Sequence, residues 1–216
     1  MSPTGVIARI RLNPYSRAVQ RDLRDATHMH RTVMRLAPDD LGDAPRRTAG
    51  LLYRVDETTT ASTLLIQGNT IDPGRLPADY GHADVKDLAP MFAALREGLA
   101  VNYRIVLNPV KRERLPLQQK GRRGRIIPLA GPEADHWWRQ RAADAGLQLH
   151  VLTPTNLAPA RARGADAPSM RHSLVRYDGT ATITDPQALT QAVLTGIGRG
   201  KAYGAGLLSL APSRTS

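Results

Sequence analysis

Two histidines, His28 and His30, lie two positions apart at the start of an expected helix. Residues at i and i+2 of a helix point about 200° apart, so the two imidazoles are not expected to share a metal ion. His30 lies off the apolar stripe of this helix and beside Arg31, so it can face a bound polyanion. Because imidazole titrates near neutral pH, it suits proton transfer. His30 is therefore a candidate general acid or base, although a lone helix histidine can also be a surface or capping residue.

Positive charge is concentrated in one short segment of the chain. The sequence has 30 Lys and Arg against 19 Asp and Glu, a net charge of +11, and such a surplus indicates a polyanionic partner such as nucleic acid. Residues 111–125 hold seven basic side chains and one acidic side chain, Glu113, which leaves +6. The pattern predicts a β-hairpin. Its candidate phosphate contacts are Lys111, Lys120, Arg122, Arg123 and Arg125. A solvated, charged hairpin tip is the alternative.

A glycine-rich segment near the C-terminal end is a second candidate contact. Residues 196–206, G-I-G-R-G-K-A-Y-G-A-G, contain five glycines in eleven positions. The segment is not a P-loop, because Ala202 follows the lysine where Ser or Thr is needed, and it also fails the G-x-G-x-x-G pattern. Glycines let a backbone approach a phosphate chain and offer N–H groups to it, while Arg199 and Lys201 add charge. The alternative is a tight helix-to-strand turn.

The elements that would position these residues form two similar halves. Apolar residues alternate over 6–12 and again over 101–107, which predicts two strands. Each strand ends at Asn-Pro, and proline removes a ladder donor. The hexapeptides R-I-R-L-N-P, from Arg9, and R-I-V-L-N-P, from Arg104, repeat at an offset of 95 residues.

The remaining patterns complete a strand and helix order in each half. The first half is expected to contain helices capped by Ser16 and Thr27, with the stripe Met29, Val33 and Leu36 in the second, and strands at 51–55 and 63–67. Residues 72–90 are expected to be mostly turns, with room for a short helix and a short edge strand. The second half is expected to contain the hairpin, a helix from Pro132, strands at 147–152 and 173–183, a helix after Asp185-Pro186, and a strand at 203–210. Both halves approximate β-α-β-β-α-β, so we expect an α+β fold of tandem ferredoxin-like domains, residues 1–90 and 91–216.

Composition excludes several classes of site. The chain has no cysteine, so disulfides, zinc-thiolate sites and thiol nucleophiles are absent. No stretch of about 18 apolar residues could span a bilayer, and Arg9 and Arg11 interrupt the apolar N-terminal segment, unlike a signal peptide. We therefore expect a cytoplasmic protein with no membrane partner. Aromatic residues make up only 4%, so nucleic-acid recognition should rest on phosphates and shape more than on base stacking.

The tail G-I-G…K…G-x-G-L-L-S-L-A-P resembles the glycine-rich motif of CRISPR repeat-processing endoribonucleases, most closely the CasE family of type I-E systems. The same resemblance covers L-N-P after the first strand, M-H-R-T at 29–32, N-P-V-K at 108–111 and Asp185-Pro186. It implies tandem ferredoxin-like domains, binding of the CRISPR repeat RNA stem-loop, and cleavage at the 3′ base of that stem without metal or cofactor. It also implies that the protein stays on its product as a subunit of the Cascade complex.

The chemistry of such a cut needs few protein groups. RNA supplies its own nucleophile, the 2′-OH, so a protein must only accept a proton, protonate the leaving 5′-oxygen and stabilise the charge on phosphorus. The resemblance places the family's catalytic histidine on His30. Family members often have tyrosine three residues earlier, where this chain has Thr27. The second proton-transfer group therefore stays open between His28, a nearby basic side chain and His30 alone.

Two further arginines, Arg161 and Arg163, lie in a Pro- and Gly-rich loop where relatives also carry basic residues. They are candidates to stabilise the phosphorane charge, or else part of a solvated loop. A non-catalytic subunit that shields the RNA hairpin is the alternative function. A basic protein of ribosome or RNA-maturation type fits the tail motif less well.

Overall fold

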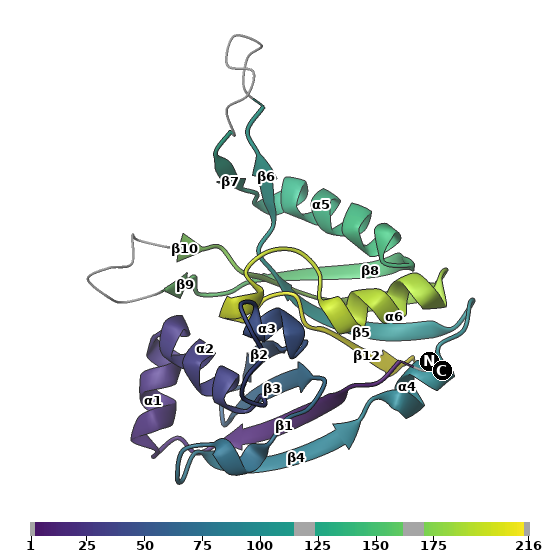
Figure 1. Ribbon diagram of the computed structural model, residues 1–216. Helices are drawn as coiled ribbons and strands as arrows, with labels where there is room; N and C mark the ends of the chain where they lie inside the picture. Colours follow the sequence, from purple (N-terminus) through teal and green to yellow (C-terminus); the bar gives the residue numbers. More distant parts are fainter. Residues whose placement is uncertain (1–2, 115–123, 162–170, 214–216) are drawn as a thin grey trace.

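The computed structural model describes residues 3–114, 124–161 and 171–213, which form two four-stranded antiparallel sheets with helices packed on them (Figure 1). The first half contains β1 (Val6–Leu12), α1 (Arg17–Arg24), α2 (Ala26–Arg35), α3 (Pro45–Thr48), β2 (Leu52–Glu57), β3 (Ser62–Gly68), the 3-10 turn η1 (Pro73–Arg75) and β4 (Gly81–Asp87). Its sheet has the order β2-β3-β1-β4.

The second half begins after α4 (Ala89–Ala94), which connects the two sheets. It contains β5 (Ala100–Leu107), β6 (Val110–Arg112), β7 (Ile126–Pro128), α5 (Gly131–Asp144), β8 (Leu147–Asn156), β9 (Ala160–Arg161), β10 (Arg171–His172), β11 (Val175–Ile183), α6 (Pro186–Thr195), the 3-10 turn η3 (Lys201–Tyr203) and β12 (Leu208–Pro212). Its main sheet has the order β12-β5-β11-β8, and β6-β7 and β9-β10 form two-stranded ribbons.

Both main sheets have the strand order of a ferredoxin-like fold. Counting the four main strands of each half along the chain, both sheets read fourth, first, third, second. Strands β1 and β5 are thus equivalent inner strands, and each carries its copy of the repeated hexapeptide. The expected α+β class with tandem ferredoxin-like architecture is confirmed.

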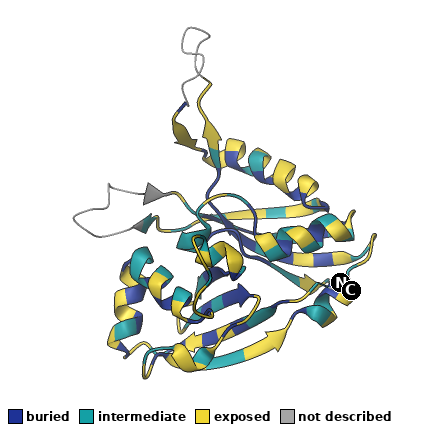
Figure 2. Ribbon diagram, viewed as in Figure 1, coloured by how far each residue is buried: buried dark blue, intermediate teal, exposed yellow. Residues whose placement is uncertain are grey.

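Each sheet buries one face against its helices. In the first half, Ile10 of β1 and Ile66 of β3 pack with Met29 and Val33 of α2. In the second half, Trp138 of α5 is fully buried in the corresponding core. Figure 2 shows buried residues along the sheets and exposed residues over the β6-β7 ribbon, which projects from the molecule. Among the described residues, no helix is both long and apolar enough to cross a membrane.

Three expectations were wrong in detail. Helix α2 is capped by Asp25, whose side chain accepts from the Thr27 N–H at 2.7 Å, so Thr27 lies inside the first turn. Residues 72–90 contain less turn than expected, because η1 and the seven-residue edge strand β4 occupy most of this stretch, although a short helical turn and an edge strand were expected there. The last strand begins at Leu208, not at residue 203, because Gly200 and Gly204 adopt left-handed conformations around η3.

Buried polar contacts join the two halves. Gln67 of β3 donates to the Val193 carbonyl of α6 at 2.7 Å. The Arg54 guanidinium of β2 is only 2% exposed and donates to the carbonyls of Arg104 and Leu207, both at 3.2 Å. These bonds satisfy groups that would be costly to bury alone. The two sheets are therefore fixed relative to one another.

Candidate active site

Helix α2 presents His30 on the side that faces the second half. Met29 and Val33 of this helix are buried in the first core, and the ring of His30 is half-buried next to η3. Asp22 of α1 ties α1 to the second half of α2 and to Tyr80, because its buried carboxylate accepts from the hydroxyls of Thr32 at 2.6 Å and Tyr80 at 2.9 Å. The position of His30 is thus set by packing and by a buried carboxylate.

The glycine-rich segment brings η3 against α2. Gly196 has a φ of 73°, and a side chain there would lie 2.7 Å from Leu52 of β2, so only glycine allows this close approach. The Tyr53 hydroxyl of β2 donates to the Ala202 carbonyl at 3.0 Å. Lys201 donates from Nζ to the Thr195 carbonyl at 2.8 Å. Turn η3 is therefore held from both sides.

Four side chains meet where α2, α3 and η3 come together, and we call them the junction cluster: His30, Arg46, Lys201 and Tyr203. The ring centroids of His30 and Tyr203 are 6.3 Å apart and their planes are tilted by 45°. Arg46 of α3 is half-buried and donates to the Leu51 carbonyl at 2.9 Å. Two cations and an imidazole thus share one small region at the join of the two halves.

Burial and like charge shift the titration of this cluster. The pKa of His30 is lowered from 6.5, first by burial and then by the Arg46 charge. The pKa of Lys201 is lowered by the same two causes in the same order. Burial also lowers the pKa of Arg46. The cluster therefore holds a neutral imidazole at neutral pH in a field of positive charge, and an anion placed there would be stabilised.

A cleft of about 630 Å³ opens beside the cluster, between the two halves. Its walls come from α1, α2 and β2 on one side and from residues 157–160 on the other, and Tyr203 forms part of its lining. Ala26 and Met29 of α2 line it one turn or less before His30. Tyr203 is the member of the junction cluster that lines this cleft.

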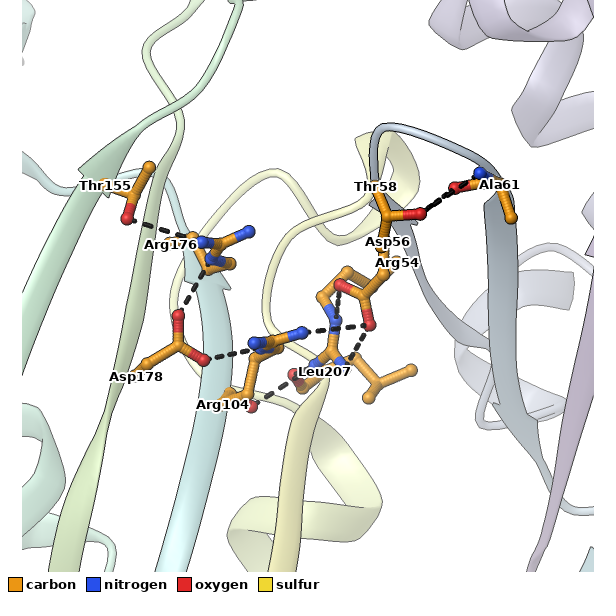
Figure 3. A network of polar contacts seen from close by, with 9 residues as sticks. All are labelled: Arg54, Asp56, Thr58, Ala61, Arg104, Thr155, Arg176, Asp178 and Leu207. Atoms are coloured by element: carbon orange, nitrogen blue, oxygen red, sulfur yellow. Dashed lines mark hydrogen bonds and ion pairs between the residues drawn. The ribbon is translucent and has the colours of Figure 1, made fainter.

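A chain of ion pairs closes one side of this cleft (Figure 3). Arg54 binds Asp56 through two bonds, at 2.8 and 3.0 Å, and Asp178 joins Arg104 at 2.5 Å to Arg176 at 2.8 Å. Arg104 also lies 3.8 Å from Asp56, so the pairs run from β2 through β5 to β11. Arg54 and Arg176 both line the cleft. The network thus links the walls of the cleft across the two halves.

The predicted site residues on α2 and η3 lie close together, and others lie apart. His30, Thr27 and the exposed Arg31 share α2, while Lys201 and the exposed Arg199 come from η3 and the turn before it. The Arg161 backbone lies in β9, which contacts α2. The Arg161 side chain and all of Arg163 lie outside the described residues.

The basic hairpin projects away from α2 (Figure 1), although its base follows Asn108, which lies beside Gly200 of the glycine-rich segment. Lys111 on β6 pairs with Glu133 at 3.0 Å, and Arg125 is exposed just before β7. Strands β6 and β7 confirm the hairpin, whose predicted contacts Lys120, Arg122 and Arg123 lie outside the described residues. A ligand touching both this ribbon and His30 must therefore extend along the molecule.

Sequence reasoning did not single out Arg46 and Tyr203 as members of the site. Tyr203 stood within the glycine-rich motif, yet its nearness to His30 depends on a contact between residues 173 positions apart. Arg46 follows a proline in a connection without a motif. Within the described part of the chain, no three His, Cys, Asp or Glu residues group in a way that could hold a metal ion.

Two sheets of ferredoxin-like strand order, with a histidine helix and a basic glycine-rich turn meeting between them, define a tandem ferredoxin-like protein. The profile of the family described as CRISPR associated protein matches residues 7–212. The chain belongs to this family, among its type I-E CasE members.

Individual relatives cover almost all of the chain. The CRISPR-associated endoribonuclease Cse3 of Thermus thermophilus is 29% identical over 219 residues, which span 95% of this chain and 99% of the relative. The CRISPR system Cascade subunit CasE of Escherichia coli K12 is 27% identical over 193 residues, 88% of this chain and 93% of the relative.

Solved structures of related proteins are similar to this chain over nearly its whole length. Thermus thermophilus Cse3 bound to an RNA representing a pre-cleavage complex has a TM-score of 0.78 at 27% identity, covering 97% of this chain and all of that one. A chain of a CRISPR RNA-guided surveillance complex, captured pre-nicking, is 38% identical with a TM-score of 0.71, covering 96% of this chain and all of that one.

Proposed function

We propose that this protein is an endoribonuclease that cuts CRISPR repeat RNA at the 3′ base of its stem-loop and stays bound to the product as a Cascade subunit in the cytoplasm. The observation that carries the proposal is the junction cluster, in which His30 faces Arg46, Lys201 and Tyr203. The names of Cse3 and CasE, with nearly full coverage of both chains, support it. The first fold unit, residues 1–90, would carry His30, and residues 91–216 the basic ribbon and glycine-rich segment.

The proposed reaction uses the RNA's own 2′-OH and no metal ion. The 2′-oxygen bonds to phosphorus while the bond to the 5′-oxygen breaks, which yields a 2′,3′-cyclic phosphate and a 5′-hydroxyl. His30 moves a proton at one of these oxygens, since its lowered pKa leaves the imidazole neutral and able to accept. Arg46, Lys201 and Arg161 are the candidates to stabilise the charge on phosphorus. Arg163 stays a further candidate from the sequence.

RNA binding in this proposal uses two groups of basic residues. Arg31, Arg199 and Lys201 would hold the phosphates around the cut. Lys111, Lys120, Arg122, Arg123 and Arg125 on and beyond the β6-β7 ribbon would hold the stem. The ribbon's projection from the molecule, away from α2, gives the stem a length of surface to lie on (Figure 1). Phosphate contacts of this kind position an RNA without reading its bases.

The test is incubation of the protein with its host's repeat RNA in EDTA. We expect a single cut at the 3′ base of the stem, with a cyclic phosphate on the upstream fragment. An RNA with a 2′-deoxy nucleotide before the cut should bind and stay intact. Cleavage of that RNA would exclude attack by the 2′-OH, and loss of all cleavage in EDTA would exclude the metal-free reaction.

One observation favours a second function, that of a non-catalytic subunit that shields the RNA hairpin. Thr27 stands where relatives often carry tyrosine, and threonine is not among the usual proton-transfer side chains. Tight binding of the repeat RNA without any cut, under the same conditions, would establish this alternative.

A further inference from the structure

The reaction proposed above moves two protons on opposite sides of one phosphorus. One leaves the 2′-OH as the 2′-oxygen bonds to phosphorus, and another must reach the 5′-oxygen as its bond to phosphorus breaks. The two oxygens lie roughly in line through the phosphorus, so two separate side chains serve them best. His30 accounts for one of these groups.

Among the described side chains, the one placed to be the second is Tyr203. Its ring lies 6.3 Å from that of His30, centroid to centroid, and it lines the 630 Å³ cleft beside the cluster. Thr27 lies inside the first turn of α2 and carries no proton-transfer group of the usual kind. His28 lines a separate recess with Arg17 and Arg21, which agrees with its place on the other side of the helix.

Two neighbouring side chains hold the turn that carries Tyr203. The Tyr53 hydroxyl donates to the Ala202 carbonyl, and Lys201 donates to the Thr195 carbonyl. Both bonds hold the backbone of η3, and Gly200 and Gly204 at its two ends have φ values of 84° and 83°. Burial and then the charge interaction with Tyr203 raise the pKa of Tyr53. The bonds from Tyr53 and Lys201 thus fix the turn that carries Tyr203.

We propose that the Tyr203 hydroxyl donates the proton to the leaving 5′-oxygen while His30 accepts the proton of the 2′-OH. This inference rests on the proposed ribonuclease function. The step leaves Tyr203 as a phenolate and His30 as an imidazolium, and one proton moved from imidazolium to phenolate through water restores both. Lys201 is on the same turn as Tyr203, and Arg46 lies near both His30 and Lys201, so positive charge is present in the region where the proton moves.

The division of roles follows from the surroundings of each group. Burial and Arg46 keep His30 neutral, which is the form that accepts a proton. A phenol ordinarily carries its proton at neutral pH, which is the form that donates one. A tyrosine from the glycine-rich turn would then supply what Thr27 does not.

The first part of the test is Tyr203→Phe, which keeps the ring and removes only the hydroxyl. In single-turnover cleavage of the repeat RNA we expect the rate constant to fall by about 100-fold or more, the usual contribution of one acid or base, with RNA affinity and thermal unfolding unchanged. The matched control is Tyr15→Phe, which removes a hydroxyl from a side chain that is 89% exposed and remote from η3. It should cut at the wild-type rate.

The second part replaces the leaving 5′-oxygen of the RNA with sulfur. A thiolate leaves without a proton, so the loss caused by Tyr203→Phe should shrink from about 100-fold to less than about threefold on this RNA. His30→Ala should remain defective on both RNAs, because the 2′-OH must still lose its proton.

These experiments distinguish failure of the role of Tyr203 from failure of the ribonuclease function. Wild-type cleavage with an unaffected Tyr203→Phe variant overturns only the role of Tyr203. An equal defect of Tyr203→Phe on the oxygen and sulfur RNAs also overturns it, because Tyr203 would then position or deprotonate. A wild-type protein that binds the RNA and cuts neither substrate overturns the ribonuclease function together with this inference.

Discussion

At the scale of single residues, the site depends on a histidine kept neutral by its neighbours. Burial and the Arg46 charge both disfavour the imidazolium, so His30 titrates below 6.5. A general base works in its neutral form, and the cleavage rate should fall as pH drops through the pKa of His30. The acidic limb of the profile of cleavage rate against pH is therefore expected at a lower pH than a catalytic histidine with an unshifted pKa would give.

Arg46→Gln tests this electrostatic coupling. Removing the charge takes away one of the two causes that lower the pKa of His30, so the acidic limb should move to higher pH, while burial keeps it below 6.5. The measurement is the single-turnover rate against pH. Arg47→Gln, an exposed neighbour on the same short helix, should leave the limb in place. A limb unmoved by Arg46→Gln would contradict the coupling.

His30→Ala separates catalysis from binding. Cleavage should be abolished, while hairpin affinity changes by less than about tenfold, because one neutral imidazole adds little to phosphate attraction. Affinity is measured at equilibrium in EDTA. A larger loss of binding would make His30 mainly a binding or folding residue.

Sequence could locate His30 and the basic character of residues 199–201, since both stand inside short motifs. It could not find the junction cluster. Tyr203 and Arg46 become neighbours of His30 only when α3 and η3 pack against α2, and neither approach leaves a local pattern. Thr27 was taken for a cap for a different, local reason: Asp25, two residues earlier, is an equally good cap type, and its carboxylate accepts from the Thr27 N–H.

At the scale of elements, the helix pair α1-α2 depends on one buried carboxylate. Asp22→Ala leaves the hydroxyls of Thr32 and Tyr80 without this acceptor, which should lower the free energy of unfolding by about 3 kcal/mol. Urea unfolding followed by circular dichroism measures it. Asp144→Ala, which breaks an exposed pair with Arg141, should cost less than about 1 kcal/mol. Equal losses of unfolding free energy in the two variants would show that the buried carboxylate of Asp22 contributes no more to stability than the exposed one of Asp144.

The basic residues of the β6-β7 ribbon lead to a prediction about how RNA affinity depends on salt concentration. If its residues contact stem phosphates, each contact contributes roughly 0.7 to 0.9 to the slope of log affinity against log salt. Replacing Lys120, Arg122, Arg123 and Arg125 with alanine should flatten the slope by about 2 to 4, while saturating protein still cuts the RNA at low salt. Lys86→Ala, on the exposed strand β4, is the control. An unchanged slope would move the stem-binding surface elsewhere.

Elements with a clear period were predictable, and elements set by long-range packing were less so. Alternation located β1 and β5, and Asp185 was a correct helix start, accepting from the Gln187 and Ala188 N–H groups. The full length of β4 was less predictable from the turn-rich residues over 72–90, since this strand forms by pairing with β1, about 75 residues away in the sequence.

At the scale of the whole molecule, the two halves are held by a buried arginine. Arg54→Ala removes a 2% exposed guanidinium and leaves Asp56 with only Arg104, 3.8 Å away, so unfolding free energy should fall by about 3 to 5 kcal/mol. The cleft between the halves should loosen as well, which hydrogen exchange at β2 and β12 would report. Arg9→Ala, which breaks an exposed pair with Asp84, should change stability by less than about 1 kcal/mol. A loss that small for Arg54→Ala would contradict its role.

The order in which the members of the junction cluster occur along the chain also has a consequence for synthesis. His30 leaves the ribosome early, and the first half can fold while translation continues. Lys201 and Tyr203 reach it only after α6 has emerged, and they stay in place once β12 pairs with β5, as Leu208 does opposite Ile105. A nascent or truncated chain that ends before residue 201 therefore carries the histidine without its partners. Such chains should lack the cleavage proposed above, so activity begins only after η3 and β12 have been synthesised.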